Sequence, residues 1–111
     1  MNFKISLFII LILFMGKPID AQEKRTLKLA MAQMLVEGGE KQKNLNRAVA
    51  RIEEAAKNKV DVILLPEAMD LGWTHSSAKT DAEPIPGGST FQILANATKK
   101  NMIYVCAGIQ E

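Results

Sequence analysis

The feature that most constrains the fold is an aliphatic run at residues 60–67, VDVILLPE, which ends on a proline and then a carboxylate. A nearly unbroken aliphatic run of this length is typical of a strand that is buried on both faces of a parallel sheet. Pro66 has no amide hydrogen, so we expect the strand to end there. The pattern therefore predicts an α/β fold in which Glu67 lies just beyond the carboxyl end of a buried strand.

Glu67 is a candidate catalytic residue because of this place in the fold. In open α/β sheets, ligands bind in the crevice outside the carboxyl ends of the strands. A carboxylate with apolar neighbours at that edge is suited to act as a general base. Position and charge alone favour a simpler interpretation, in which Glu67 caps a loop or pairs with a nearby Lys or Arg. The rest of the chain has to decide between the two.

Residues 1–21 have the layout of a secretory signal peptide. Lys4 supplies a positive charge, residues 5–15 are apolar apart from one serine, and a helix-breaking GKP sequence follows. The apolar run is too short for a membrane anchor, because a spanning helix needs roughly 20 residues. We expect cleavage after Ala21 and a secreted or periplasmic product that begins at Gln22.

Charge and cysteine content narrow the classes of protein. The chain has 111 residues and a formal net charge of +2, which is close to neutral and argues against nucleic acid as a partner. Residues 22–111 suffice for one small domain with a modest core. The single cysteine, Cys106, cannot form an internal disulfide, so its thiol is either buried or reactive. The surroundings of the single histidine, His75, show no metal-ligand spacing, and we expect no cofactor.

Two more strands and a helix flank the central run. Residues 27–34 alternate, with Leu29 and Met31 on one face and small residues on the other, which predicts a first strand that a helix packs against closely. Residues 40–58 place Leu45 and Ile52 on one apolar stripe of a helix. This spacing predicts a βαβ unit with a right-handed crossover. Residues 102–109 predict a third buried strand, in which the Cys106 thiol packs as a small hydrophobic group.

A long irregular stretch at residues 68–88 separates the central strand from a second helix. A loop of this length in a compact domain is usually functional or disordered. Trp73 in this loop has two interpretations of similar weight: a hydrophobic plug beneath the loop, or a substrate contact. The second helix is expected to begin at Ser89, because Ser89 and Gln92 have the spacing of a capping box.

Five short segments stand out in order along the chain: LAMAQ at residues 29–33, the Asn44-Leu45 pair, VILLPE at residues 62–67, PGG at residues 86–88 and AGIQE at residues 107–111. In their order and spacing, these segments resemble the opening part of the nitrilase, or carbon–nitrogen hydrolase, superfamily. The resemblance covers essentially all of the chain after residue 21, and no single motif carries it. Where members of the family often have a Gly-Tyr pair in the loop, this chain has Gly72-Trp73.

The resemblance implies a four-layer α-β-β-α sandwich, commonly dimerised through helices, of which residues 22–111 are the N-terminal β-α-β-α-β part. It also implies hydrolysis of a small amide or nitrile to an acid and an amine or ammonia by a Glu, a Lys and a Cys. Glu67 matches the Glu, which acts as the general base. The Lys and the Cys of the family follow the third strand, so Cys106 does not match the nucleophile. The resemblance therefore implies that this chain alone is inactive and that the full-length form is a homo-oligomer.

Two other classes stay open from the residues alone. One is a non-catalytic secreted α/β binding or interaction module that keeps the half-fold. The other is an α/β enzyme of a different family whose site also follows the second strand. A lysine and then a cysteine encoded downstream of Glu111 would support the hydrolase, whereas an intended stop codon and a stable secreted product would support the module.

Overall fold

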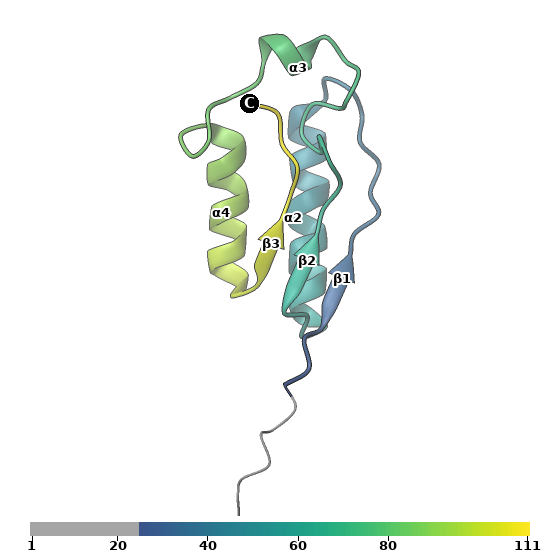
Figure 1. Cartoon of the computed structure of the whole chain (residues 1–111), viewed down its shortest axis with the longest axis vertical. Coiled ribbons are helices and arrows are strands. Elements are labelled where there is room, and N and C mark those ends of the chain that lie inside the picture. The colour runs from purple at the N-terminus through teal and green to yellow at the C-terminus, as the bar shows by residue number, and fades with distance from the viewer. Residues whose placement is uncertain (1–24) are drawn as a thin grey trace, which may run out of the picture.

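The computed structural model describes residues 25–111 as a small α/β unit with one parallel sheet. The signal peptide predicted for residues 1–21 lies outside these residues. Between residues 25 and 111, none of the helices combines the length and the apolar composition that crossing a membrane requires. Along the chain, the elements are β1 (Leu29–Met31), α2 (Lys41–Lys57), β2 (Val62–Leu64), α3 (Ser77–Thr80), α4 (Ser89–Asn101) and β3 (Tyr104–Cys106) (Figure 1).

The strands pair in the order β1-β2-β3, and both pairings are parallel. All three carboxyl ends therefore meet at one edge of the sheet, the upper edge in Figure 1. The predicted order of strand, helix, strand, helix and strand is confirmed, although each strand is shorter than predicted. Beyond β2, the Leu65 N–H still donates to the Cys106 carbonyl at 2.8 Å. Regular strand structure has ended before Pro66, in agreement with its missing amide hydrogen.

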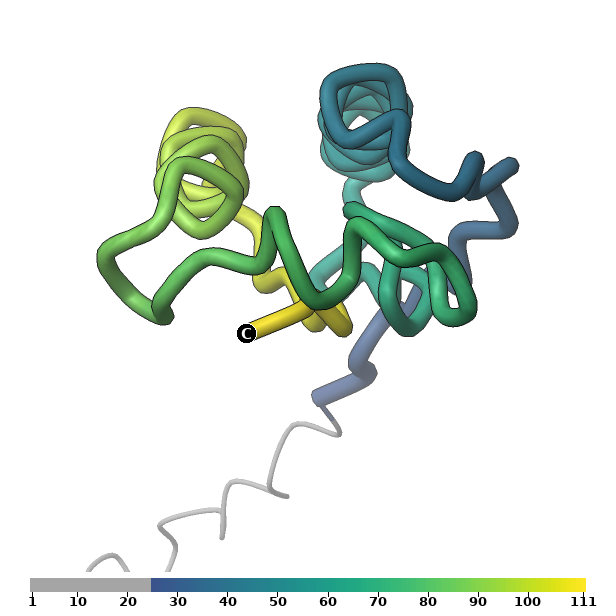
Figure 2. The backbone as a smooth tube through the Cα atoms, turned by 90° about the horizontal axis from the view of Figure 1, so that it is seen from above, coloured from purple at the N-terminus to yellow at the C-terminus, as the bar shows by residue number. Residues whose placement is uncertain are grey.

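Both long helices cover the same face of the sheet, as the view in Figure 2 shows. The central residues of the three strands, Ala30, Ile63 and Val105, share one register row that contributes to the core. Ile63 is only 1% exposed and belongs to one apolar cluster with Ile52 of α2 and Leu94 of α4. Each such buried aliphatic side chain contributes about 1.5–3 kcal/mol to folding. Ala30, a small residue predicted on the face that a helix packs against, is partly buried against this cluster as expected.

Helix α2 forms because strong helix formers coincide with one apolar stripe. Alanine and long polar side chains favour a helix over this segment. Leu45 and Ile52 are buried as the periodicity predicts, and Ala48 and Ala55 widen the buried stripe. The same stripe contains Asn44, a polar side chain that is completely buried. A buried amide needs hydrogen-bond partners, and those of Asn44 lead to the candidate site.

The opposite face of the sheet has no cover among residues 25–111. Leu29, Met31 and Tyr104 are 52%, 77% and 75% exposed, and they share register rows with Val62, Leu64 and Cys106. The prediction that the central strand is buried on both faces is therefore not met within residues 25–111, where Val62 and Leu64 are only half-buried. The prediction that the Cys106 thiol is packed is wrong for the same reason, because Cys106 is a free and exposed cysteine on the uncovered face. A contiguous apolar surface of this kind favours association.

We predict that Met31→Lys and Tyr104→Lys together increase the soluble fraction of residues 22–111 when this segment is expressed alone. Lysine at these positions breaks up the uncovered apolar face without entering the core. Sedimentation of lysates and light scattering of the purified segment measure the effect. Lys in place of Asn46, on the exposed side of α2, adds charge away from that face and serves as control. Equal improvement by the control would contradict the role of the sheet face.

Candidate active site at the carboxyl edge of the sheet

Glu67 lies where the sequence places it, at the carboxyl edge of the sheet and directly beside the continuation of β3. The Gly108 N–H donates to the Pro66 carbonyl at 3.3 Å, and the Met69 N–H donates to the Gly108 carbonyl at 2.9 Å. A Cβ atom added at Gly108 would lie 2.7 Å from the Cα atom of Glu67, a distance that real Cβ atoms do not reach. Only glycine therefore permits this approach of the two backbones.

The Glu67 side chain is exposed, so residues 25–111 do not form the apolar wall expected around it. Glu67 also forms no salt bridge within the described part of the chain. The pairing with a nearby Lys or Arg, one form of the simpler interpretation, is therefore not found among these residues. Residues 25–111 therefore present the Glu67 carboxylate to solvent on a closely packed backbone. An accessible carboxylate of this kind can accept a proton from a bound molecule.

The turn that follows Glu67 is built as part of the core and is not irregular. Ala68, Met69, Asp70 and Leu71 are each at most 2% exposed. Ala68 has a φ angle of 49°, in the left-handed region. That conformation costs a non-glycine residue roughly 1–2 kcal/mol, so surrounding contacts must hold it. Residues 68–71, the start of the predicted loop, thus form a fixed support for Glu67.

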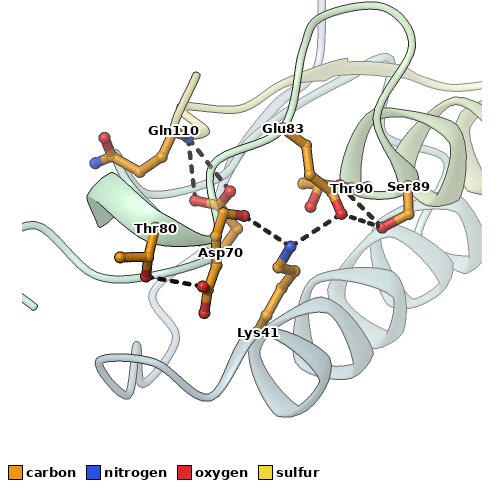
Figure 3. A network of polar contacts seen from close by, with 8 residues as sticks. Lys41, Asp70, Thr80, Glu83, Ser89, Thr90 and Gln110 are labelled. Carbon is orange, nitrogen blue, oxygen red and sulfur yellow. Dashed lines mark hydrogen bonds and ion pairs between the residues drawn. The ribbon is translucent and has the colours of Figure 1, made fainter. Parts of the chain in front are cut away.

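Two polar side chains hold this turn. The Asn44 amide of α2 donates to the Asp70 carbonyl at 2.9 Å. The Asp70 side chain, only 1% exposed, accepts the Gln110 N–H, with N–O distances of 3.2 and 3.3 Å (Figure 3). The turn is therefore tied to α2 on one side and to the chain that continues from β3 on the other.

Trp73 and His75, which share the loop with this turn, have different surroundings. The Trp73 side chain is 68% exposed, so it is not a plug beneath the loop. His75 packs against two glycines: a Cβ atom added at Gly38 or Gly39 would lie 2.9 or 2.7 Å from the nearest atom of the His75 side chain. The His75 Nδ1 atom accepts the Ser77 N–H at 3.2 Å and lies 2.8 Å from the Ser77 Oγ atom. His75 is exposed to solvent, and these contacts hold its ring in place two residues before α3.

A carboxylate that the sequence analysis did not single out, Glu83, joins the two long helices near the same edge. It pairs with Lys41, at the first position of α2, at 3.0 Å. It also accepts hydrogen bonds from the Ser89 hydroxyl and the Thr90 N–H at the start of α4, both at 2.9 Å (Figure 3). The Thr90 N–H, followed by Lys41 and Ser89, lowers the pKa of Glu83 to about 2.

Glu83 thereby replaces the capping box predicted for α4. The residue before the helix is Gly88, which has no side chain to cap it, and Ser89 is already helical. The Gln92 side chain donates to the Pro86 carbonyl at 3.0 Å and does not return to the helix start. A carboxylate at a helix N-terminus satisfies free N–H groups and is favoured by the helix dipole. The predicted helix start is confirmed, but the predicted capping pair is wrong.

The described residues offer no metal site: between residues 25 and 111 there is no cluster of three or more His, Cys, Asp or Glu side chains that would hold an ion. The chemistry available at the edge is that of the Glu67 carboxylate. Asn44, Asp70 and Glu83 support this edge, and sequence reasoning assigned none of them a role. The sequence did offer one signal for Asn44, because it is a polar residue directly beside Leu45 on the apolar stripe of its helix.

Comparison with known proteins decides the family. The profile of the family described as Carbon-nitrogen hydrolase matches residues 28–111. The chain belongs to the carbon–nitrogen hydrolase family. The match includes the strand that carries Glu67 and the whole described sheet, so the resemblance inferred from the sequence is confirmed.

Several curated relatives support this assignment. A nitrilase homolog 2 of Dictyostelium discoideum is 33% identical over 88 residues, which cover 79% of this chain and 26% of the relative. A nitrilase of Pyrococcus abyssi is 32% identical over 88 residues, which cover 77% of this chain and 34% of that relative. The omega-amidase NIT2 of Mus musculus is 36% identical over 83 residues, which cover 75% of this chain and 29% of that relative. The chain thus spans about a quarter to a third of the length of these relatives.

We predict that Glu83→Gln lowers the thermal unfolding temperature at pH 7. Because the pKa of Glu83 is about 2 when folded and 4.5 ordinarily, its charged form adds stability above pH 4.5. That stability disappears as the pH falls from 4.5 toward 2, so the gap between parent and variant should close over this range. Circular dichroism melts of residues 22–111 bearing Met31→Lys and Tyr104→Lys measure it.

The matched control for this measurement is Glu54→Gln. Glu54 pairs with Arg51 on the exposed side of α2, so its replacement should change little at any pH. A gap between Glu83→Gln and the parent that stays constant from pH 7 to pH 2 would contradict the assigned role of the carboxylate.

Proposed function

We propose that this chain forms the N-terminal part of a hydrolase domain that converts a small amide or nitrile to an acid and an amine or ammonia, with Glu67 as general base. The family supports the reaction class, and the named relatives include nitrilases and omega-amidases. The observation that carries the role of Glu67 is its accessible carboxylate, free of salt bridges within residues 25–111, at the carboxyl edge of the sheet.

In this proposal, Glu67 accepts the proton of a cysteine thiol supplied by the rest of the hydrolase domain. From an amide, the thiolate attacks the carbonyl carbon, the amine or ammonia leaves with the proton that Glu67 returns, and a thioester remains. From a nitrile, the attack gives a thioimidate, and a first water must add to its carbon before ammonia leaves and the thioester remains. Glu67 then takes a proton from the water that cleaves the thioester. A lysine, also outside residues 25–111, stabilises the charge of the tetrahedral intermediate. Residues 22–111 alone are accordingly proposed to be inactive.

The uncovered face of the sheet supports the proposed four-layer sandwich. Its exposed apolar side chains, including Leu29, Met31 and Tyr104, form the kind of surface that a second sheet packs against at a spacing of about 10 Å. In the complete sandwich, a second sheet would cover Cys106 as well, so we assign Cys106 no part in catalysis. Trp73 is proposed to contact the substrate, because it is exposed on the loop that begins at Glu67. We also propose that the complete protein is a homo-oligomer.

The role of Glu67 is tested in a hybrid hydrolase in which residues 28–111 of this chain replace the matching segment of mouse omega-amidase NIT2. Glu67→Gln keeps the shape of the side chain but removes the proton acceptor. We expect ammonia release to fall by roughly 100-fold or more, the scale of a lost general base, with little change in substrate binding.

Glu40→Gln is the matched control in the same hybrid. Glu40 precedes α2, and its carboxylate is exposed and paired with Lys43. The control should keep the parental turnover, and circular dichroism should show that both variants are folded. Near-parental turnover by folded Glu67→Gln would remove the basis for the proposed chemistry.

We further propose export through the signal peptide at residues 1–21, with a mature N-terminus at Gln22. Mass spectrometry of the exported protein should give a chain that begins at Gln22, and Ala21→Arg should block cleavage because a small residue is needed before the cut. Recovery of the protein with Met1 retained in the membrane fraction would contradict this.

A further inference from the structure

Asn44 makes a set of contacts that packing of α2 alone does not require. Its side chain is 0% exposed. The amide nitrogen donates to the Glu37 carbonyl at 2.7 Å and to the Asp70 carbonyl at 2.9 Å. The amide oxygen accepts the Glu37 N–H and an Arg47 N–H, each at 3.0 Å. All four hydrogen-bonding positions of the amide are therefore used, and they join the chain before α2 to the turn after Glu67.

That turn passes the constraint directly to Glu67. The Asn44 amide fixes the carbonyl of Asp70, and the Asp70 carboxylate holds the Gln110 N–H. Two residues before Gln110, Gly108 lies against the Glu67 backbone. Glu67 is followed by the left-handed Ala68, which aims the chain into the buried turn. Loss of the Asn44 contact would remove one of the contacts that hold the backbone around Glu67 in place.

We propose that Asn44 is a positioning residue for the Glu67 carboxylate, and that it acts through the Asp70–Gln110 contact. This inference rests on the proposed function, because the benefit of a fixed Glu67 is the placement of a base against a reacting group. Displacement of a catalytic group by about 1 Å lowers the chemical rate by about 100-fold, whereas binding of the remainder of the substrate changes little. A positioning role therefore predicts a loss in kcat that KM does not share.

The test is Asn44→Asp in the hybrid hydrolase. The change keeps the shape, but it replaces the nitrogen that donates to the Glu37 and Asp70 carbonyls with an acceptor oxygen. We expect kcat to fall roughly 10- to 100-fold, with KM changed far less. Asn46→Asp is the matched control: it makes the same change two residues away, on the exposed side of α2, where the Asn46 oxygen accepts only from Gln42. It should keep the parental kcat and KM.

A second pair of variants tests the same circuit without changing α2. Asp70→Asn keeps an oxygen that accepts the Gln110 N–H and should retain most of the kcat. Asp70→Leu keeps the branched shape of the side chain but has no acceptor, and its kcat should fall as that of Asn44→Asp does. This pair carries the test if Asn44→Asp yields too little folded protein, and circular dichroism must show that Asp70→Leu is folded.

The outcomes separate this inference from the proposed function. Parental kcat in folded Asn44→Asp, or equal kcat in Asp70→Asn and Asp70→Leu, overturns the positioning role and leaves the role of Glu67 intact. In Asn44→Asp, a rise in KM of roughly 10- to 100-fold without loss of kcat also overturns it. Parental turnover in Glu67→Gln instead overturns the proposed function, whatever the Asn44 variants show.

Discussion

Parallel pairing of β2 with both of its neighbours is the constraint on which the rest of the structure depends. It brings three carboxyl ends to one edge, and it requires helical crossovers, both of which cover one face of the sheet (Figure 2). Ile63, at the centre of β2, packs under both helices and fixes their distance from the sheet. Because α2 and α4 run back along the strands, their N-terminal ends also lie at the edge that carries Glu67. Polar side chains from both helices can therefore reach the loops there.

Several patterns among neighbouring residues were sufficient to predict the main elements of the fold. The aliphatic run before Pro66 predicted the central strand, and the alternation around Ala30 predicted which face a helix would cover. Glu67 was placed correctly for the same reason, since a strand and its breaking proline are local signals. The family resemblance had the same origin, and the match over residues 28–111 confirmed it.

Contacts between distant segments were beyond the reach of those patterns. Ser89 and Gln92 had the right spacing for a cap, but Glu83 reaches the helix start from outside the helix and satisfies it with a full charge. The turn after Glu67 looked irregular because Asn44, which holds it, lies 26 positions earlier in the chain. The prediction that Cys106 is buried was wrong for residues 25–111, because its burial would need a second layer that these residues do not supply.

The packing of His75 on Gly38 and Gly39 has a consequence for how this edge can change over time. At both glycines, the space that a side chain would need is already filled by the imidazole. At position 38, the nearest atom to an added Cβ would be the His75 Cβ at 2.9 Å, which every residue except glycine carries. A larger residue at position 38 therefore requires glycine at position 75 or a shift of one of the two loops. The effects of the two substitutions should then be strongly non-additive, although the residues lie in different loops. Substitution at position 38 is thus limited by the residue at position 75, which lies in a different loop.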